Sequence, residues 1–128
     1  RPVACVAGRG PFDDVASAML AQLLAQRGVA SRRIAPAAVS RETIAELDFS
    51  GSNVITVSCL ELAGVPAHLR YLIRRLRHRA PHATLIAGLW TNGDAVLNDP
   101  QVQKAVDADR YVASMREALD ALMALPTI

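Results

Sequence analysis

Small and polar residues follow three apolar runs of this chain. The runs 3–7, 53–59 and 84–89 have the composition of strands that are covered on both faces of a parallel sheet. The carboxyl ends of parallel strands meet at one edge of the sheet, where open α/β folds bind ligands. We therefore predict a small-ligand site formed by Gly8, Arg9, Gly10, Asp13, Asp14, Ser58, Glu61, Trp90 and Thr91.

The loop after the first run indicates what kind of ligand would fit. Gly8 and Gly10 bracket a tight turn, and the amino end of the helix that follows would attract an anionic group. Asp13 and Asp14 lie at the same amino end, where their carboxylates would repel an anion. The loop is therefore expected to favour a cationic or hydroxyl-bearing ligand.

Two chemistries that use such a loop do not fit this sequence. A dinucleotide-binding loop needs Gly-x-Gly-x-x-Gly, but Asp13 stands where the third glycine is required. A phosphoacceptor receiver domain would need Asp at the end of the third strand and Lys at the end of the fifth, where this chain has Ser58 and Ser114. No cofactor is expected from these patterns.

Cysteine chemistry is the remaining alternative. Cys59 would be the nucleophile of a small enzyme, or a redox-responsive group, and His68 would be its base. Cys59 follows Ser58 in a strand, so the two side chains point to opposite faces and only one can face a shared cleft. Because no third residue is placed to orient His68, we expect a non-catalytic domain. Cys5 and Cys59 are expected to be buried without a disulfide, and no metal-ligand spacing is present.

Strands and helices alternate five times along the chain. Two further strands are expected at 29–35 and 110–113, the first at an edge because Arg32 and Arg33 interrupt it. Helices are expected from Asp13 to a left-handed cap at Gly28, after Ser40, at 66–79, at 99–107, and from Ser114 onward. The first helix would bury Val15, Met19, Leu20, Leu23 and Leu24.

Ser114 and Glu117 have the spacing of a capping box at the start of the last helix. Right-handed crossovers and short loops then predict a three-layer, doubly wound α/β fold of flavodoxin-like type. Its five-stranded parallel sheet would have the strand order 2-1-3-4-5. No linker or repeat divides residues 1–128, which are expected to form a single domain.

The helix at 66–79 is rich in arginine. Arg70, Arg74, Arg75 and Arg77 lie around an apolar stripe of leucine and isoleucine, and they are the candidates for a membrane or partner surface. One interpretation is a solvated outer face whose long side chains cover apolar surface. The other is docking on anionic lipid or on an acidic partner. Nucleic acid is not expected, because no base-reading motif is present and the net charge is only +2.

The chain resembles the cobalamin-binding domain of methylmalonyl-CoA mutase and methionine synthase over nearly its whole length. That family has Asp-x-His-x-x-Gly after strand one, Ser-x-Leu after strand three and Gly-Gly after strand four. Residues 11–16, 58–60 and 87–88 lie on these motifs. Asp13 replaces the cobalt-binding histidine and Ala16 replaces the glycine. The resemblance therefore implies a cobalamin-binding-like fold that does not bind cobalamin in the usual way.

A second resemblance is more specific. The runs 5–14, 18–24 and 66–76 look like the soluble carboxyl-terminal domain of some autoinducer-2-exporter-like permeases of alphaproteobacteria. This resemblance implies a regulatory or scaffolding domain on the cytoplasmic side of the bacterial inner membrane. Its partner would be the membrane-spanning part of its own chain. Association of several copies of the chain into a homo-oligomer is a further alternative. Since the chain begins at Arg1 without methionine, we expect a domain excised from a longer membrane protein. The alternative is a free-standing ligand-binding or redox-responsive domain.

Overall fold

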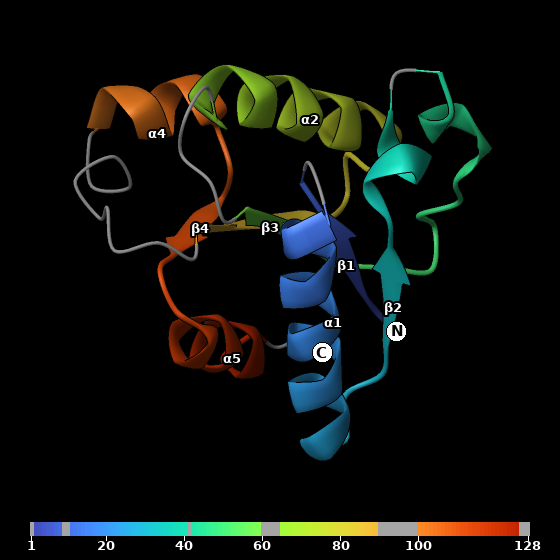
Figure 1. Ribbon diagram of the computed structural model, residues 1–128, viewed down its shortest axis with the longest axis vertical. Helices are drawn as coiled ribbons and strands as arrows, with labels where there is room; N and C mark the ends of the chain where they lie inside the picture. The colour runs from blue at the N-terminus through green and yellow to red at the C-terminus, as the bar shows by residue number, and fades with distance from the viewer. Residues whose placement is uncertain (1, 9–10, 41, 60–64, 90–99, 126–128) are drawn as a thin grey trace.

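The computed structural model describes residues 2–8, 11–40, 42–59, 65–89 and 100–125 (Figure 1). Five strands form one sheet in the order β2-β1-β3-β4-β5, and all neighbouring strands are parallel. They are β1 (Val3–Ala7), β2 (Ser31–Ile34), β3 (Val54–Cys59), β4 (Thr84–Leu89) and β5 (Arg110–Val112). This arrangement confirms the predicted flavodoxin-like α/β fold and its strand order.

Helices cover both faces of the sheet. Figure 1 shows α1 (Pro11–Gln26) and α5 (Met115–Met123) on one face, and α2 (Val65–Arg79) and α4 (Pro100–Val106) on the other. The chain crosses from β2 to β3 through two short 3-10 helices, η1 (Pro36–Val39) and η2 (Ile44–Glu46). The sheet is therefore the middle one of three layers.

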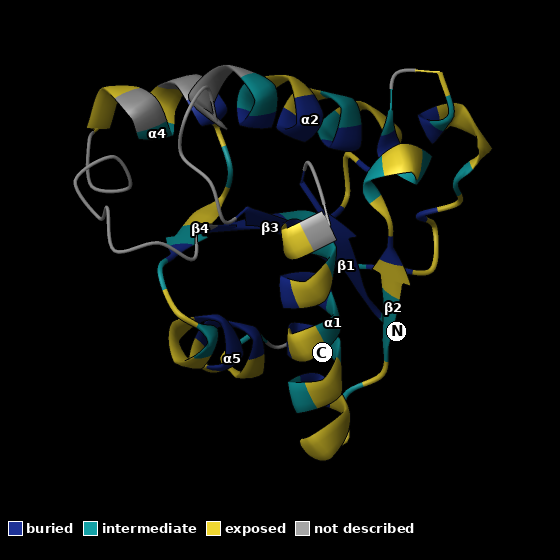
Figure 2. Cartoon of the chain, in the orientation of Figure 1, coloured by how far each residue is buried: buried dark blue, intermediate teal, exposed yellow. Residues whose placement is uncertain are grey.

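The central strands are buried on both faces because each face carries its own apolar core. All residues of β1 and β3 are buried (Figure 2). Val54 joins the core under α1 and α5, whereas Ile55, Val57 and Cys59 join the core under α2. By the alternation of side chains along a strand, Thr56 and Ser58 face the side of α1 and α5.

Helix α1 buries a different face from the one that its sequence predicts. Leu20 and Leu24 are buried as expected, but Val15 and Met19 are 56% and 52% exposed. The buried positions run instead through Asp13, Ala16 and Ser17 to these leucines. Small and polar side chains thus face the sheet along the first turns of α1.

The segment after β2 follows its prediction in part. The sequence predicts a short helix capped by Ser40, and the short helix η2 does follow this residue, but it is a 3-10 helix and Thr43 rather than Ser40 precedes it. Thr43 Oγ1 donates to the carbonyl oxygen of Ala37 at 2.6 Å and lies 2.7 Å from Ser40 Oγ. Hydroxyl groups that bond to nearby backbone in this way compete with α-helical hydrogen bonding.

The ends of two helices follow the sequence closely. Gly28 has φ of 75° after α1, so it adopts the predicted left-handed conformation. Ser114 Oγ accepts a hydrogen bond from the Glu117 amide at 3.1 Å, and the Glu117 carboxylate accepts one from the Ala113 amide at 2.8 Å. The capping pair is therefore confirmed, with the carboxylate reaching one residue further back than the usual box.

Candidate functional site

Gly8 lies at the carboxyl end of β1, where a side chain has no room. Its amide donates to the carbonyl oxygen of Ser58 at 2.9 Å, which continues the pairing of β1 with β3. A Cβ atom at this position would lie 2.3 Å from Cys59 Sγ and 3.0 Å from the Ser58 carbonyl oxygen. Glycine is thus required by the close approach of β3, independently of any ligand.

The two aspartates after Gly8 have different environments. Asp13 is only 6% exposed, and its Oδ2 would lie 3.6 Å from a Cβ on Gly8. Asp14 points instead to the edge of the sheet, where it forms a 3.2 Å salt bridge with Arg33 of β2. Only Asp13 is therefore brought against the end of β1.

Small residues occupy one row across the carboxyl ends of the central strands. Ala7 pairs with Ser58, and Ser58 pairs with Gly88, so the three lie side by side on β1, β3 and β4. Since paired residues of parallel strands point to the same face, this row faces α1 and α5. Ser17 of α1 lies three residues before Leu20 and is fully buried, which places it on the helix face above the sheet.

The hydroxyl groups of Ser17 and Ser58 are buried and have no hydrogen-bond partner in the described part of the chain. Both residues are 0% exposed, and neither hydroxyl has a hydrogen-bond partner among the described residues. A buried hydroxyl that makes no hydrogen bond destabilises a fold by about 1–3 kcal/mol. Thr56 lies two residues before Ser58, on the same face of β3, and contacts the Cys5 thiol. The pKa of this thiol is raised mainly by burial. The carboxyl edge therefore combines small side chains with unused hydrogen-bonding capacity.

Cys59 and His68 contact the same strand end from the face of α2. Cys59 is 3% exposed, and its thiol lies against Gly8. His68 Nε2 lies 2.7 Å from the Gly8 carbonyl oxygen. Cys59 and Ser58 point to opposite faces, as predicted, so Ser58 rather than Cys59 faces α1. The expectation that both cysteines are buried without a disulfide is confirmed.

The arginines of α2 separate into two groups. Arg70, Arg74 and Arg77 line a pocket between α2 and α4 together with Lys104. Arg75 lies on the other side of the helix, where its Nε donates to the Val39 carbonyl oxygen at 3.2 Å. The four predicted arginines therefore do not form one surface.

Part of the predicted site lies outside the described residues, namely Arg9, Gly10, Glu61, Trp90 and Thr91. Other residues were missed by the sequence analysis. Ser17 was missed because a serine within a helix gives no signal until its burial is known. Lys104 was missed because it comes from another helix than the arginines, so no sequence spacing joins them.

The described residues contain neither a metal-binding cluster nor a membrane-spanning helix. No group of three His, Cys, Asp or Glu side chains among them is placed to hold a metal ion. None of their helices is both long enough and apolar enough to cross a membrane.

Two solved structures share this fold. One is a novel cobalamin-binding protein from Desulfitobacterium hafniense DCB-2, with a TM-score of 0.68 and 12% identity over 96% of this chain. The other is RcsB from Salmonella enterica serovar Typhimurium, solved bound to promoter rprA with phosphomimetic BeF3-, with a TM-score of 0.60 and 18% identity over 98% of this chain. This chain spans 58% and 67% of the length of those two chains, respectively. At these identities the likeness shows the fold alone.

No protein-family profile matches the sequence. No curated protein matches it either.

Proposed function

We propose that this chain is a non-catalytic domain that binds a small, hydroxyl-bearing ligand at the carboxyl edge of its sheet. The observation that carries the proposal is the pair of buried hydroxyls of Ser17 and Ser58, which have no partner among the described residues. Each hydroxyl can donate one hydrogen bond and accept others. A ligand hydroxyl or amide placed between α1 and β3 would satisfy both groups and offset the free energy of burying them.

The neighbouring residues favour this class of ligand. Ala7 and Gly88 flank Ser58 with minimal side chains, so little side-chain volume covers the backbone of the central strands beside this hydroxyl. Asp13 places a buried carboxylate at the end of β1, which disfavours an anion there. Phe12 is 67% exposed on the first turn of α1 and offers an apolar surface to the rest of such a ligand.

Cobalamin in its usual binding mode does not fit these residues. A lower axial ligand must reach out of the loop toward the cobalt, but Asp13 is 6% exposed and points toward Gly8. Ala16 is also buried, so its methyl group takes space that glycine leaves open in the family that this chain resembles. A carboxylate is moreover a weaker ligand than imidazole for a transition metal of this kind.

We further propose that the domain regulates or scaffolds a membrane permease from the cytoplasmic side of the bacterial inner membrane. The support is the sequence resemblance over 5–14, 18–24 and 66–76. Its partner would be the membrane-spanning part of its own chain. A ligand bound between α1 and the sheet would then shift the position of α1, and this shift would change the surface that the domain presents to that partner.

The ligand proposal is tested with the 128-residue chain. Amide signals are followed by NMR during titration with adenosine and with ribose as hydroxyl-bearing probes. We expect shifts at Gly8, Ser17 and Ser58 that disappear in Ser58→Val, which fills the row of small residues. The matched control is Ser31→Val, on the edge strand β2. Unchanged amides at millimolar concentrations of both probes would overturn the proposal, and a visible-band shift of hydroxocobalamin would overturn its exclusion.

The permease proposal is tested on the full-length protein. Protease is added to inverted inner-membrane vesicles and to spheroplasts, and the domain is detected by antibody. We expect cleavage only in the inverted vesicles. Recovery of the full-length protein entirely in the soluble fraction would contradict membrane attachment and leave the ligand proposal standing.

A further inference from the structure

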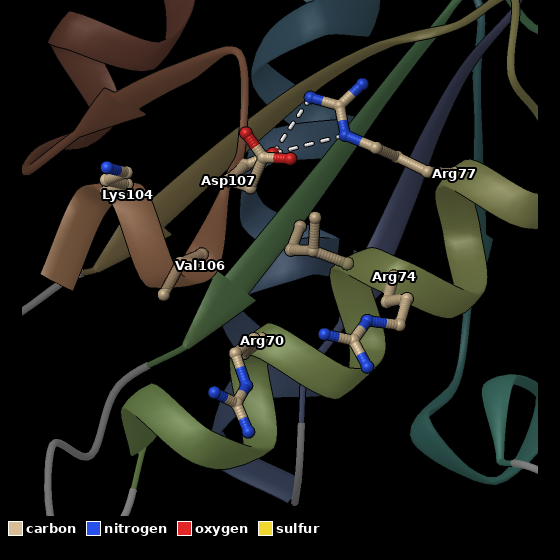
Figure 3. A pocket seen from close by; sticks show the side chains of 7 residues that line it. Arg70, Arg74, Arg77, Lys104, Val106 and Asp107 are labelled. Carbon is tan, nitrogen blue, oxygen red and sulfur yellow. Dashed lines mark hydrogen bonds between the residues drawn. The ribbon is translucent and has the colours of Figure 1, made fainter.

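A pocket lies between α2 and α4, on the opposite face of the sheet from Ser17. Its volume is about 240 Å³. Figure 3 shows Arg70, Arg74 and Arg77 rising from α2, with Lys104 across from them on α4. The three arginines are spaced four and three residues apart, which places them along one side of a helix. Helix packing, rather than any sequence motif, brings the lysine to them.

The pocket carries more positive than negative charge. Four cationic side chains and one carboxylate, that of Asp107, line it. Arg77 forms a 3.0 Å salt bridge with Asp109. Within the described ranges, Arg70, Arg74 and Lys104 have no carboxylate within salt-bridge distance. Cationic side chains that line one pocket repel one another, and a bound anion would offset this repulsion by its attraction to each of them.

Two of the guanidinium groups are held in place before any ligand binds. Arg70 donates to Tyr71 Oη at 3.0 Å and stacks 4.9 Å from the ring centre. Arg77 donates twice to the carbonyl oxygen of Asp107, at 3.1 and 2.9 Å. Such groups lose less side-chain entropy on binding than free ones do.

One nitrogen of a residue that lines the pocket has no acceptor among the described residues. Arg70 Nε is buried, and it has no hydrogen-bond partner within the described part of the chain. Guanidinium can only donate, so the missing partner must be an oxygen or another acceptor. This buried donor is independent of the charge count and points to the same kind of ligand.

The shape and chemistry of the pocket select the class of anion. Phosphate offers several oxygens to the planar fork of arginine, whereas lysine binds it as a point charge. Ile73 and Val106, which are 1% and 2% exposed, supply an apolar wall beside the cations. A phosphate group attached to an organic molecule matches both parts.

We propose that the α2–α4 pocket binds the phosphate group of a phosphorylated organic ligand through Arg70, Arg74, Arg77 and Lys104. The ligand is either a soluble phosphate monoester or the head group of an anionic lipid. The site is separate from the carboxyl edge near Ser58 and does not depend on the function proposed for that edge.

Binding is measured by NMR at about 0.15 M salt, where exposed charges are strongly screened. The probes are glycerol 3-phosphate and vesicles of phosphatidylcholine with or without phosphatidylglycerol. We expect the Arg70 Nε–H signal to shift because this donor gains an acceptor. Arg74→Gln and Lys104→Gln should each weaken binding about tenfold or more, as loss of a charge-assisted hydrogen bond does. Arg77 is left intact because it also supports the end of α4.

The matched control is Arg116→Gln, which removes the same charge from α5 on the opposite face. Binding of glycerol 3-phosphate alone would identify a soluble ligand, and binding of phosphatidylglycerol vesicles alone would identify a lipid head group. Failure of both probes, or equal weakening by Arg116→Gln and Arg74→Gln, would overturn the proposal. Ser58→Val should leave this binding unchanged, so the two proposed sites succeed or fail separately.

Discussion

His68 Nε2 lies 2.7 Å from the carbonyl oxygen of Gly8, so the first turns of α2 are bonded to the end of β1. A carbonyl oxygen only accepts hydrogen bonds, and Nε2 must therefore carry the proton. In the neutral ring the remaining lone pair is on Nδ1. The nitrogen that reaches the strand end is thus bound to the backbone, which argues against its use as the base for Cys59.

The contact between Gly8 and Cys59 predicts a specific coupling. In Gly8→Ala, the new methyl group would lie 2.3 Å from Cys59 Sγ and 3.0 Å from the Ser58 carbonyl oxygen. We expect the free energy of unfolding in urea to fall by about 1–3 kcal/mol because a packed strand end must shift. In the double variant with Cys59→Ala, part of this loss should be recovered, since the closest contact is removed. Additive losses would contradict the proposed clash.

Replacing the two buried serines tests whether their unpaired hydroxyl groups lower the stability of the free protein. Ser17→Ala and Ser58→Ala each remove a hydroxyl that has no partner among the described residues. Without ligand, we expect each variant to be as stable as the parent or more stable, by up to about 1 kcal/mol, because an unpaired polar group is no longer buried. Thermal unfolding measures this directly. A loss of 1 kcal/mol or more, which is about the contribution of a made hydrogen bond, would show that the hydroxyls already have partners.

The sheet could be predicted because its signals are local. β1 and β3 are short apolar runs that end at small or polar residues, and this pattern alone fixes buried parallel strands. Gly28 and the Ser114–Glu117 pair mark helix ends by their own chemistry. Strand order then follows from the handedness of the crossovers.

The candidate sites could be predicted only in part because they depend on packing between distant segments. Val15 and Met19 fit a helical period as well as Ala16 and Ser17 do, and only the packing of α1 against the sheet decides which pair is buried. Asp14 forms its salt bridge with Arg33 because strand β2 lies beside α1, and the sequence indicates the position of this edge strand only approximately. Lys104 lies near the arginines of α2 because α4 packs against α2, and neither helix has a sequence pattern that predicts this contact.

Asp107 adopts a conformation that most side chains disfavour. It follows α4 with φ of 64°, and its carbonyl oxygen accepts two hydrogen bonds from Arg77. Asp107→Val should lower the free energy of unfolding by about 1–2 kcal/mol, because a β-branched residue clashes in the left-handed region. Asp107→Asn and Asp107→Gly are the controls and should be close to the parent. Equal stability of all three variants in urea would contradict this backbone assignment.

The amino end of α5 is stabilised by Ser114. Its hydroxyl accepts the Glu117 amide at 3.1 Å, so Ser114→Ala leaves an amide of the first turn without its cap. We expect a loss of about 1 kcal/mol in thermal unfolding. Glu117→Gln keeps an acceptor for the Ala113 amide and should lose less. If the two substitutions are equally damaging, the carboxylate charge rather than the serine cap supports this helix end.

Stability should fall at alkaline pH because of Cys5. Burial raises the pKa of the Cys5 thiol, and the Thr56 hydroxyl opposes this only in smaller part. In the unfolded chain a thiol has a pKa of about 8.5. Stability from the neutral thiol is fully present below that pH. It is lost as the pH rises toward the higher pKa of the folded state, since the unfolded chain releases its proton first.

We therefore expect the free energy of unfolding in urea, under reducing conditions, to decrease between about pH 8 and about pH 9.5. Cys5→Ala should be less stable overall because it leaves a cavity, but its stability should depend less on pH over this range. Tyr111, whose pKa is also raised mainly by burial, adds to the slope only toward the upper end of this range, because a tyrosine in the unfolded chain has a pKa of about 10. An unchanged slope in Cys5→Ala would assign the pH dependence to another group and contradict the argument from Cys5 burial.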